Sequence, residues 1–353
     1  MKTIFKIILI LTALISISCD NMYNDIAVEI VEYDYYLAVA QNVAAGQTQI
    51  YSIDPTSMIL NQKSSLNNAP TMTVPIIASH PTGKYLFIPF FSGTGWLGSY
   101  KIKDDVSLSL INNFGLPGII SVVVHPTGNY LYCAYGSGTD VIAEYSIDES
   151  GKLTAIGSNQ ALPSGQNRMA ISPTGNFLYA GGSSSGSMIY IFPINSDGTL
   201  STPSTTVAIG GSPSIASIKT SKNGSLYCTT SSTGIYLYNK TTNILVSQGS
   251  YGGGTSGFIA FHPSGNYLYV SGGTSCYLYK INGDNTLTYV SPYATPVTIN
   301  EILVHPNGNI MFITGTNTIY SYSINSSGAI QSQLQSISSS SADGLALIRK
   351  RKL

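Results

Sequence analysis

Short apolar runs alternate with polar turns along the chain after residue 33, and no stretch there keeps an apolar period of 3.6 residues. A representative unit begins with the apolar run 119–124 and the turn His125-Pro-Thr-Gly. Three further runs, 130–135, 141–148 and 153–157, are rich in the β-branched and aromatic residues that favour strands. The pattern therefore predicts an all-β chain built from units of four short strands.

The turn phrase with its following aromatic strand occurs six times. Its glycines lie 41 to 49 residues apart, a period typical of the blades of a β-propeller. These glycines are Gly83, Gly128, Gly175, Gly224, Gly265 and Gly308. The repeat predicts that the whole chain beyond the N-terminal region is a single ring of blades.

A second phrase, aromatic-x-Ile-polar, ends one strand of each unit and is found six times, with a degenerate seventh copy at Tyr238. Seven copies against six glycine turns leave one blade without an inner strand. Residues 343–348 have the character of that strand, and they would complete the blade formed by 35–40 and 49–54. We therefore predict a seven-bladed β-propeller with four antiparallel strands per blade, closed by pairing of the N- and C-terminal strands in one blade.

The N-terminal region has the features of an export signal: Lys2 and Lys6, an apolar stretch over 7–17, and then Cys19. We expect a signal peptide over 1–18, a lipidated tether over 19–33 and a single propeller domain over 34–353. Cys19 resembles the lipid-modified cysteine of bacterial lipoproteins, although an ordinary signal peptidase could instead leave a soluble protein. The expected location is the outer membrane, the cell surface or the periplasm.

Charged residues make up only 9% of the chain and their formal sum is zero. Without a basic field to hold phosphates, nucleic acid is excluded as an expected partner. The mature ring has three cysteines, Cys133, Cys228 and Cys276, which we expect to be buried and unpaired. We expect a monomer that contacts a membrane only through its lipid anchor.

All four histidines, His80, His125, His262 and His305, lie three residues before a turn glycine. Equivalent positions lie apart around a ring, so these side chains are not expected to converge on a metal, and each should instead bond its own turn. We predict no metal and no cofactor. Ser184 in Gly182-Ser-Ser-Ser-Gly186 matches the nucleophile pattern Gly-x-Ser-x-Gly, but no helix pattern follows it and no histidine is left to act as base.

The candidate site follows from aligning the blades on their turn glycines. Seven residues before the glycine, two blades carry a charge: Arg168 in the third copy and Glu301 in the sixth, three blades apart and thus nearly opposite. Since isolated buried charges are costly, the two should pair with each other or meet a polar ligand. The expected ligand-binding set is Asn167, Arg168, Lys219, Asn300, Glu301 and Asp343. A structural pair, ligand binding and acid–base catalysis by Glu301 or Arg168 all stay open.

The phrase Pro-[Thr/Ser/Asn]-Gly-[Asn/Lys]-[Tyr/Phe]-Leu-[Tyr/Phe] resembles the lactonase family of seven-bladed propellers, named for bacterial 6-phosphogluconolactonase, and the related surface proteins with Tyr-Val-Thr-Asn blades. The resemblance spans residues 35–348. It implies lactone ring opening or cycloisomerase chemistry, with Arg, Glu and His side chains lining a central channel. Arg168 and Glu301 are the residues of this sequence that match that arrangement.

Two functions follow. The first is a binding or interaction module at the bacterial cell envelope, anchored through Cys19, that holds a protein or glycan by its loop face. The alternative is a lactonase-type hydrolase in which Glu301 acts as general base for water and Arg168 holds the carbonyl or carboxylate. A redox function would need cofactor ligands that the sequence does not offer.

Overall fold

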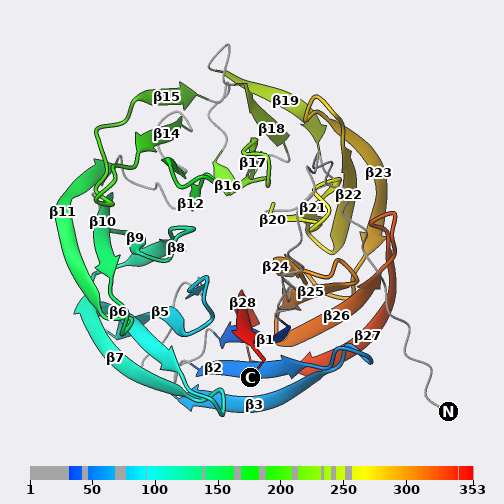
Figure 1. Ribbon diagram of the computed structural model, residues 1–353. Coiled ribbons are helices and arrows are strands. Elements are labelled where there is room, and N and C mark those ends of the chain that lie inside the picture. Colours follow the sequence, from blue (N-terminus) through cyan, green and yellow to red (C-terminus); the bar gives the residue numbers. More distant parts are fainter. Residues whose placement is uncertain are drawn as a thin grey trace, which may run out of the picture. The chain divides into compact units, whose positions relative to one another are not determined.

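Seven antiparallel sheets of four strands surround a common axis (Figure 1). The structure is a computed structural model and describes residues 32–41, 47–67, 77–92, 94–136, 140–162, 168–182, 188–208, 214–231, 234–239, 244–250, 257–340 and 342–352. The sheets all belong to one unit, Tyr33–Leu353. The predicted seven-bladed β-propeller is confirmed, including its four antiparallel strands per blade.

The strands follow in chain order, and each sheet is given from its inner strand outward. The closing sheet has β28 (Ala342–Arg351), β1 (Tyr33–Gln41), β2 (Gln47–Ile53) and β3 (Leu60–Asn67). The next two have β4 (Ala78–Ser79), β5 (Tyr85–Ser92), β6 (Thr94–Ile102) and β7 (Leu108–Gly115), then β8 (Ile119–Val124), β9 (Tyr130–Gly136), β10 (Asp140–Ile147) and β11 (Leu153–Leu162). The fourth and fifth have β12 (Arg168–Ile171), β13 (Phe177–Gly181), β14 (Met188–Pro193) and β15 (Thr205–Ala208), then β16 (Ile215–Thr220), β17 (Leu226–Thr230), β18 (Gly234–Asn239) and β19 (Ile244–Ser250). The last two have β20 (Ile259–Phe261), β21 (Tyr267–Gly272), β22 (Ser275–Ile281) and β23 (Leu287–Ala294), then β24 (Ile299–Val304), β25 (Ile310–Gly315), β26 (Thr318–Ile324) and β27 (Ile330–Ser338).

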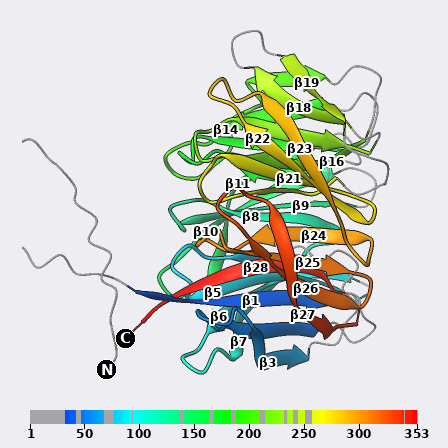
Figure 2. The ribbon, with the colours of Figure 1, turned by 90° about the vertical axis from the view of Figure 1, so that its right-hand side faces the viewer.

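The C-terminal strand closes the ring in the way that the sequence predicts. β28 pairs antiparallel with β1, and Gly344 lies opposite Ala40. Ser121 lies opposite Ala134 at the same point of the third blade. Figure 2 shows β28 and β1 running side by side, so the first and last strands share one sheet and neither is left as an edge.

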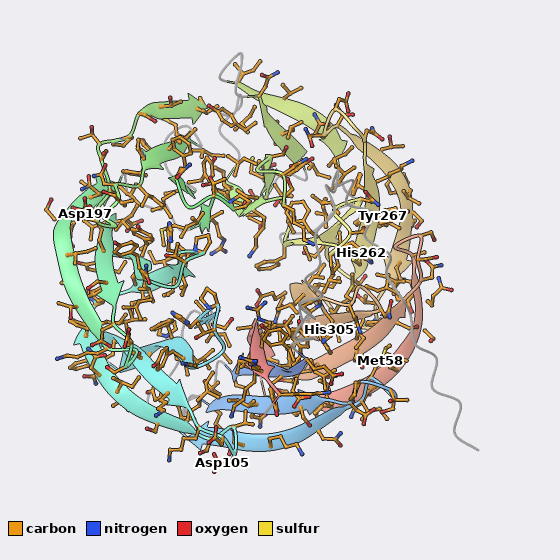
Figure 3. All side chains as sticks on the ribbon, in the orientation of Figure 1. Met58, Asp105, Asp197, His262, Tyr267 and His305 are labelled. Atoms are coloured by element: carbon orange, nitrogen blue, oxygen red, sulfur yellow. The ribbon has the colours of Figure 1, made fainter. Side chains whose placement is uncertain are left out.

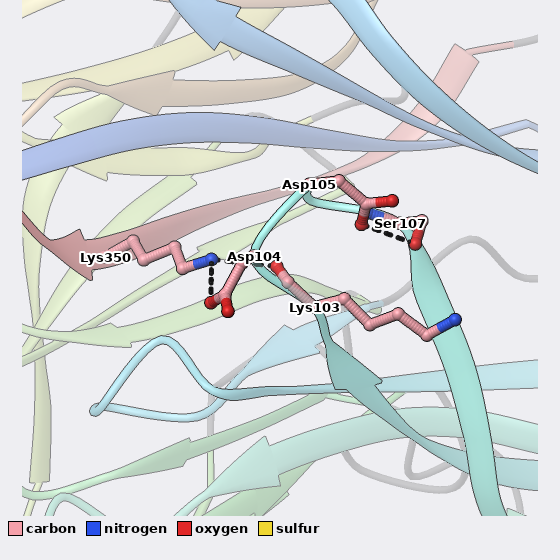
Figure 4. A network of polar contacts seen from close by, with 5 residues as sticks. All are labelled: Lys103, Asp104, Asp105, Ser107 and Lys350. Carbon is pink, nitrogen blue, oxygen red and sulfur yellow. Dashed lines mark hydrogen bonds and ion pairs between the residues drawn. The ribbon is translucent and has the colours of Figure 1, made fainter.

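A polar contact also ties this last strand to the next blade. Lys350 Nζ lies 3.1 Å from Asp104 Oδ1 and donates to the backbone oxygen of Lys103 at 2.8 Å (Figure 4). In the same hairpin, the Asp105 carboxylate accepts from the amide and hydroxyl of Ser107. Because the Asp104 side chain is 97% exposed, the ion pair adds little stability, and closure depends on strand pairing and packing.

The hydrophobic core lies between the blades. Seven clusters of buried residues fill the seven interfaces, and each draws on two neighbouring sheets. Tyrosines on the second strands also bond the next blade: Tyr132 donates to Gly198 O at 2.8 Å, and Tyr269 donates to Gly328 O at 2.6 Å. The aromatic repeat of the sequence is therefore mainly blade-to-blade packing, with its polar ends satisfied by backbone.

The histidines do more than bond their own turns. Thr82 N donates to His80 Nδ1 at 3.2 Å, as expected, but His80 Nε2 also lies 2.8 Å from the carbonyl oxygen of Gly128 in the next blade. A carbonyl only accepts, so Nε2 donates, and Nδ1 accepts from Thr82 N, so these two bonds together assign the neutral ring with its proton on Nε2. His125 and His262 make the same bond across their interfaces, to Gly175 and Gly308. Histidine thus links neighbouring blades, a role that the turn position alone did not reveal.

Figure 3 labels two of the four turn histidines, His262 and His305, with Tyr267 beside His262. The His262 and Tyr267 rings meet edge to face, with centroids 5.8 Å apart. His305 makes a similar contact of 4.7 Å with Tyr35 of the closing blade. Both histidines are therefore packed against an aromatic ring as well as hydrogen-bonded.

We expect the melting temperature to fall as the pH drops below about 6.5, the ordinary pKa of histidine. Burial lowers the pKa of His80, against the opposing effect of its bond to Gly128, and burial also lowers that of His305. The unfolded chain therefore takes up protons first, and stability that is complete above pH 6.5 declines as the pH falls toward the folded pKa values. Thermal unfolding followed between about pH 7.5 and about pH 5 tests this. His80→Gln should flatten the slope, and an unchanged slope in that variant would contradict the assignment.

Candidate functional site

Arg168 begins the inner strand β12 and reaches toward the next blade. It lies opposite Gly181 of β13, and its Nε donates to the backbone oxygen of Ala216 in β16 at 2.8 Å. Burial lowers the pKa of its guanidinium, and the negative charge of Glu301 partly offsets that shift. An arginine stays protonated under such a shift, so the site holds a fixed positive charge.

Glu301 holds the equivalent position in β24, directly after a bulge, and lies opposite Thr314. Its Oε2 accepts from the amide of Leu345 in β28 at 2.6 Å. The side chain is half-buried. A carboxylate that accepts a backbone amide makes a charge-assisted bond, which is stronger than the bond between two neutral groups.

The two charged residues therefore act in the same way on opposite sides of the ring. Each bonds the inner strand of the next blade, Arg168 through a carbonyl and Glu301 through an amide. Their strands face each other across the axis in Figure 1, and the negative charge of Glu301 raises the pKa of Arg168 against the larger effect of burial. One cation and one anion thus lie at equivalent positions of inner strands three blades apart.

The other predicted site residues have different outcomes. Lys219 lies on β16 opposite Tyr227 and is exposed. Asn300 lies at the bulge before Glu301 and is half-buried. The backbone of Asp343 belongs to β28, but its side chain, like Asn167, lies outside the described part of the chain. Cys19 and Ser184 also lie outside it.

Two groups of the site escape sequence reasoning because they belong to the backbone. Ala216 O and Leu345 N are the partners of the charged pair, and nothing in a sequence marks which carbonyl or amide a side chain will contact.

Glu144 is a further buried charged residue, which the repeat pattern of the sequence did not mark. Its Oε2 accepts from Leu200 N of the next blade at 3.0 Å, and burial raises its pKa. Its position in β10, far from the inner strands, makes it an interface residue.

Metal and thiol chemistry find little support in the described residues. Among them no group of three histidine, cysteine, aspartate or glutamate side chains could hold a metal ion. Cys133, Cys228 and Cys276 are buried and unpaired as expected, and burial raises the pKa of each thiol. In the same part of the chain, no helix has the length and hydropathy needed to cross a membrane.

Known proteins of similar structure share the fold. A protein of Bacteroides uniformis described as a "putative 6-phosphogluconolactonase" is 18% identical, with a TM-score of 0.78 over 90% of this chain and 99% of that one. A protein of Bacteroides fragilis with the same description is 16% identical, with a TM-score of 0.73 over 93% and 100%. A Lactobacillus plantarum protein is 16% identical, with a TM-score of 0.75 over 90% and 99%.

At such identities the structures show the fold alone, and function must be argued from the site. No curated protein matches the sequence. A family model described as "Lactonase, 7-bladed beta-propeller" matches residues 117–223, which hold the third blade, β12–β15 and the start of the fifth. Over residues 117–223 the chain is thus similar to the lactonase family of seven-bladed β-propellers, and the same seven-bladed architecture continues around the rest of the ring.

Proposed function

We propose that the protein is an exported, lipid-anchored binding module of the bacterial cell envelope, which holds a protein or glycan at the loop face where the inner strands begin. The observation that carries this proposal is the engagement of both charged groups by backbone, Arg168 with Ala216 O and Glu301 with Leu345 N. Groups fixed in this way are oriented in advance, which suits recognition of a polar ligand. The sequence pattern that predicts an export signal, with Cys19 after it, supports the proposed location.

The second candidate is lactone hydrolysis, favoured by the family and by the names of the two Bacteroides structures. In that reaction Glu301 would take a proton from water as the water oxygen attacks the lactone carbonyl. The ring C–O bond would then break, and the departing oxygen would receive the proton. Arg168 would hold the developing negative charge. Two observations speak against this reaction. Glu301 Oε2 already accepts a hydrogen bond from Leu345 N. His80, His125 and His262 each use a ring nitrogen for a hydrogen bond across a blade interface.

The test compares binding and turnover in one set of variants. We expect the purified protein to show saturable binding to a member of a panel of neutral and acidic glycans, and Arg168→Gln to weaken it about 10-fold or more, since hydrogen bonds from charged groups contribute about 1.5–3 kcal/mol. Lys219→Gln also removes one positive charge, but from an exposed side chain of the neighbouring strand, and should leave binding within about 2-fold. Lactone turnover that Glu301→Gln abolishes would overturn the proposal in favour of the hydrolase.

A further inference from the structure

The turn between β16 and β17 is one residue shorter than the other turns of the repeat. In the third blade His125 N bonds Tyr130 O, five residues on, and in the sixth His262 N bonds Tyr267 O. In the fifth blade Ser221 N bonds Ser225 O, only four residues on. Tyr227 pairs with Leu237 in the way that Tyr132 pairs with Glu144, so the strands stay in register and the missing residue belongs to the turn.

In the second, third and sixth blades that residue is a tyrosine whose ring covers the hairpin of the next blade, whereas the fourth and seventh blades have Phe177 and Ile310 there. A Cβ added to Gly151, Gly198 or Gly328 would lie 2.3, 2.1 or 2.7 Å from the ring of Tyr85, Tyr130 or Tyr267 respectively. The phenol oxygens also bond the hairpins: Tyr130 donates to Ser196 O at 3.1 Å, and Tyr85 donates to Glu149 O. All three rings thus lie against a hairpin glycine, and those of Tyr85 and Tyr130 also have a carbonyl acceptor at the second hairpin residue.

The sixth blade presents its hairpin, residues 282–285, without such a ring. A pocket of 460 Å³ lies there instead, lined by both blades. At the hairpin position that glycine holds elsewhere is Asn285, with a φ of 67°, and its Oδ1 accepts from Asn223 Nδ2 at 2.5 Å. Tyr238, at the aromatic position that is buried as Tyr145 in the third blade, is half-buried and lines the pocket. The volume is within the usual range of small-ligand sites.

The lining selects an uncharged ring. Leu237, Val246 and Tyr238 supply apolar and aromatic walls. Asn239 and Gln248 also line the pocket, and Gln248 Oε1 accepts from Leu287 N at 3.0 Å. None of the lining residues carries a positive charge, and Asp284 adds a negative one, so anions are disfavoured. Gly283 stands at the hairpin position whose carbonyl accepts the phenol hydroxyl in two other blades.

We propose that this pocket binds a neutral phenolic ring, supplied by a small molecule or by a tyrosine side chain of a partner. The chain itself provides the template, because three of its other blades place a tyrosine, Tyr85, Tyr130 or Tyr267, at the corresponding position. The pocket lies where β16 ends, whereas Arg168 and Glu301 lie where their strands begin, so the two sites are on opposite faces of the ring. The proposal is therefore independent of the function proposed above.

The probe is 4-methylphenol, with binding followed by protein NMR shifts. We expect saturable shifts at the pocket with a dissociation constant on the order of 1 mM, and binding of toluene about 5-fold weaker, because toluene lacks the hydroxyl. A tyrosine inserted between Ser225 and Leu226, together with Asn285→Gly, should fill the pocket, abolish binding and raise the melting temperature. Leu237→Trp, which narrows the pocket from its wall, gives a second test should the insertion not fold.

Two controls separate this site from others. Leu110→Trp adds the same ring at an exposed leucine of β7 and should leave binding unchanged, as should Arg168→Gln at the opposite face. A short flexible peptide with one tyrosine distinguishes the two sources of the phenolic ring. If the peptide binds more tightly than 4-methylphenol, the natural ligand is a tyrosine side chain of a partner. If it binds more weakly, the natural ligand is a small molecule. Absence of binding at about 10 mM probe, equal binding to the filled variants, or a preference for a hexose would overturn the proposal.

Discussion

Gly128→Ala is expected to lower the free energy of unfolding by about 2–5 kcal/mol. Gly128 has a φ of +83°, in the left-handed region that L-residues adopt only at a cost. Its added Cβ would also lie 2.4 Å from His80 Nε2, the atom that bonds the carbonyl of the same glycine. The substitution therefore strains the turn and pushes the two blades apart at the same point.

Gly265→Ala is the matched control. Its φ of +79° is almost the same, but no atom lies within 4 Å of the added Cβ. The control should cost only the backbone strain, about 1–2 kcal/mol. Urea unfolding of both variants gives the difference. Equal losses would show that the histidine contact does not contribute, and would contradict the role of histidine at the interfaces.

Removal of residues 342–353 is expected to prevent the ring from folding as a stable monomer. Leu345 and Ile348 are buried in β28, and burial of each contributes about 1.5–3 kcal/mol. β1 would also lose its pairing along the whole length of β28. A loss of more than about 5 kcal/mol approaches the whole stability of an ordinary domain.

Circular dichroism and size-exclusion chromatography of the shortened chain test this prediction. A chain that ends at Arg351 keeps β28 complete and should fold like the full protein. A synthetic peptide of residues 342–353, added to the shortened chain, should restore part of the folded population because it can pair with β1. A shortened chain that melts cooperatively near the temperature of the full protein would disprove closure by β28.

Most of the fold could be predicted from the sequence because the repeat encodes it several times. The strand 119–124 coincides with β8, and the position of Gly344 agrees with its register against Ala40. The predicted ends of some strands are wrong, because pairing with the neighbouring strand, and not composition, determines where a strand ends. β11 runs to Leu162, well beyond the predicted 157, because it follows β10 past a bulge.

The site was only partly predictable, for a different reason. Arg168 and Glu301 stand out because charge is scarce, but their partners are backbone atoms of Ala216 and Leu345 that no residue type marks. The pocket beside Asn285 has a signal in the sequence, because the turn phrase that starts at Ser221 is one residue shorter than the others. The sequence alone does not show that the equivalent tyrosine of three other blades covers a hairpin, so the pocket could not be predicted from the shorter phrase.

The distribution of histidine around the ring has a mechanical consequence. At three interfaces a histidine donates a hydrogen bond to the glycine carbonyl of the following blade. The fourth and fifth blades have a serine instead of this histidine, Ser172 and Ser221. A serine side chain is too short to make the same bridge, and no neighbour lies within 4 Å of a Cβ at Gly224 or Gly265. Sheet β16–β19 therefore lacks the histidine bridge on both of its sides, and we expect its amides to exchange with solvent before those of the other sheets.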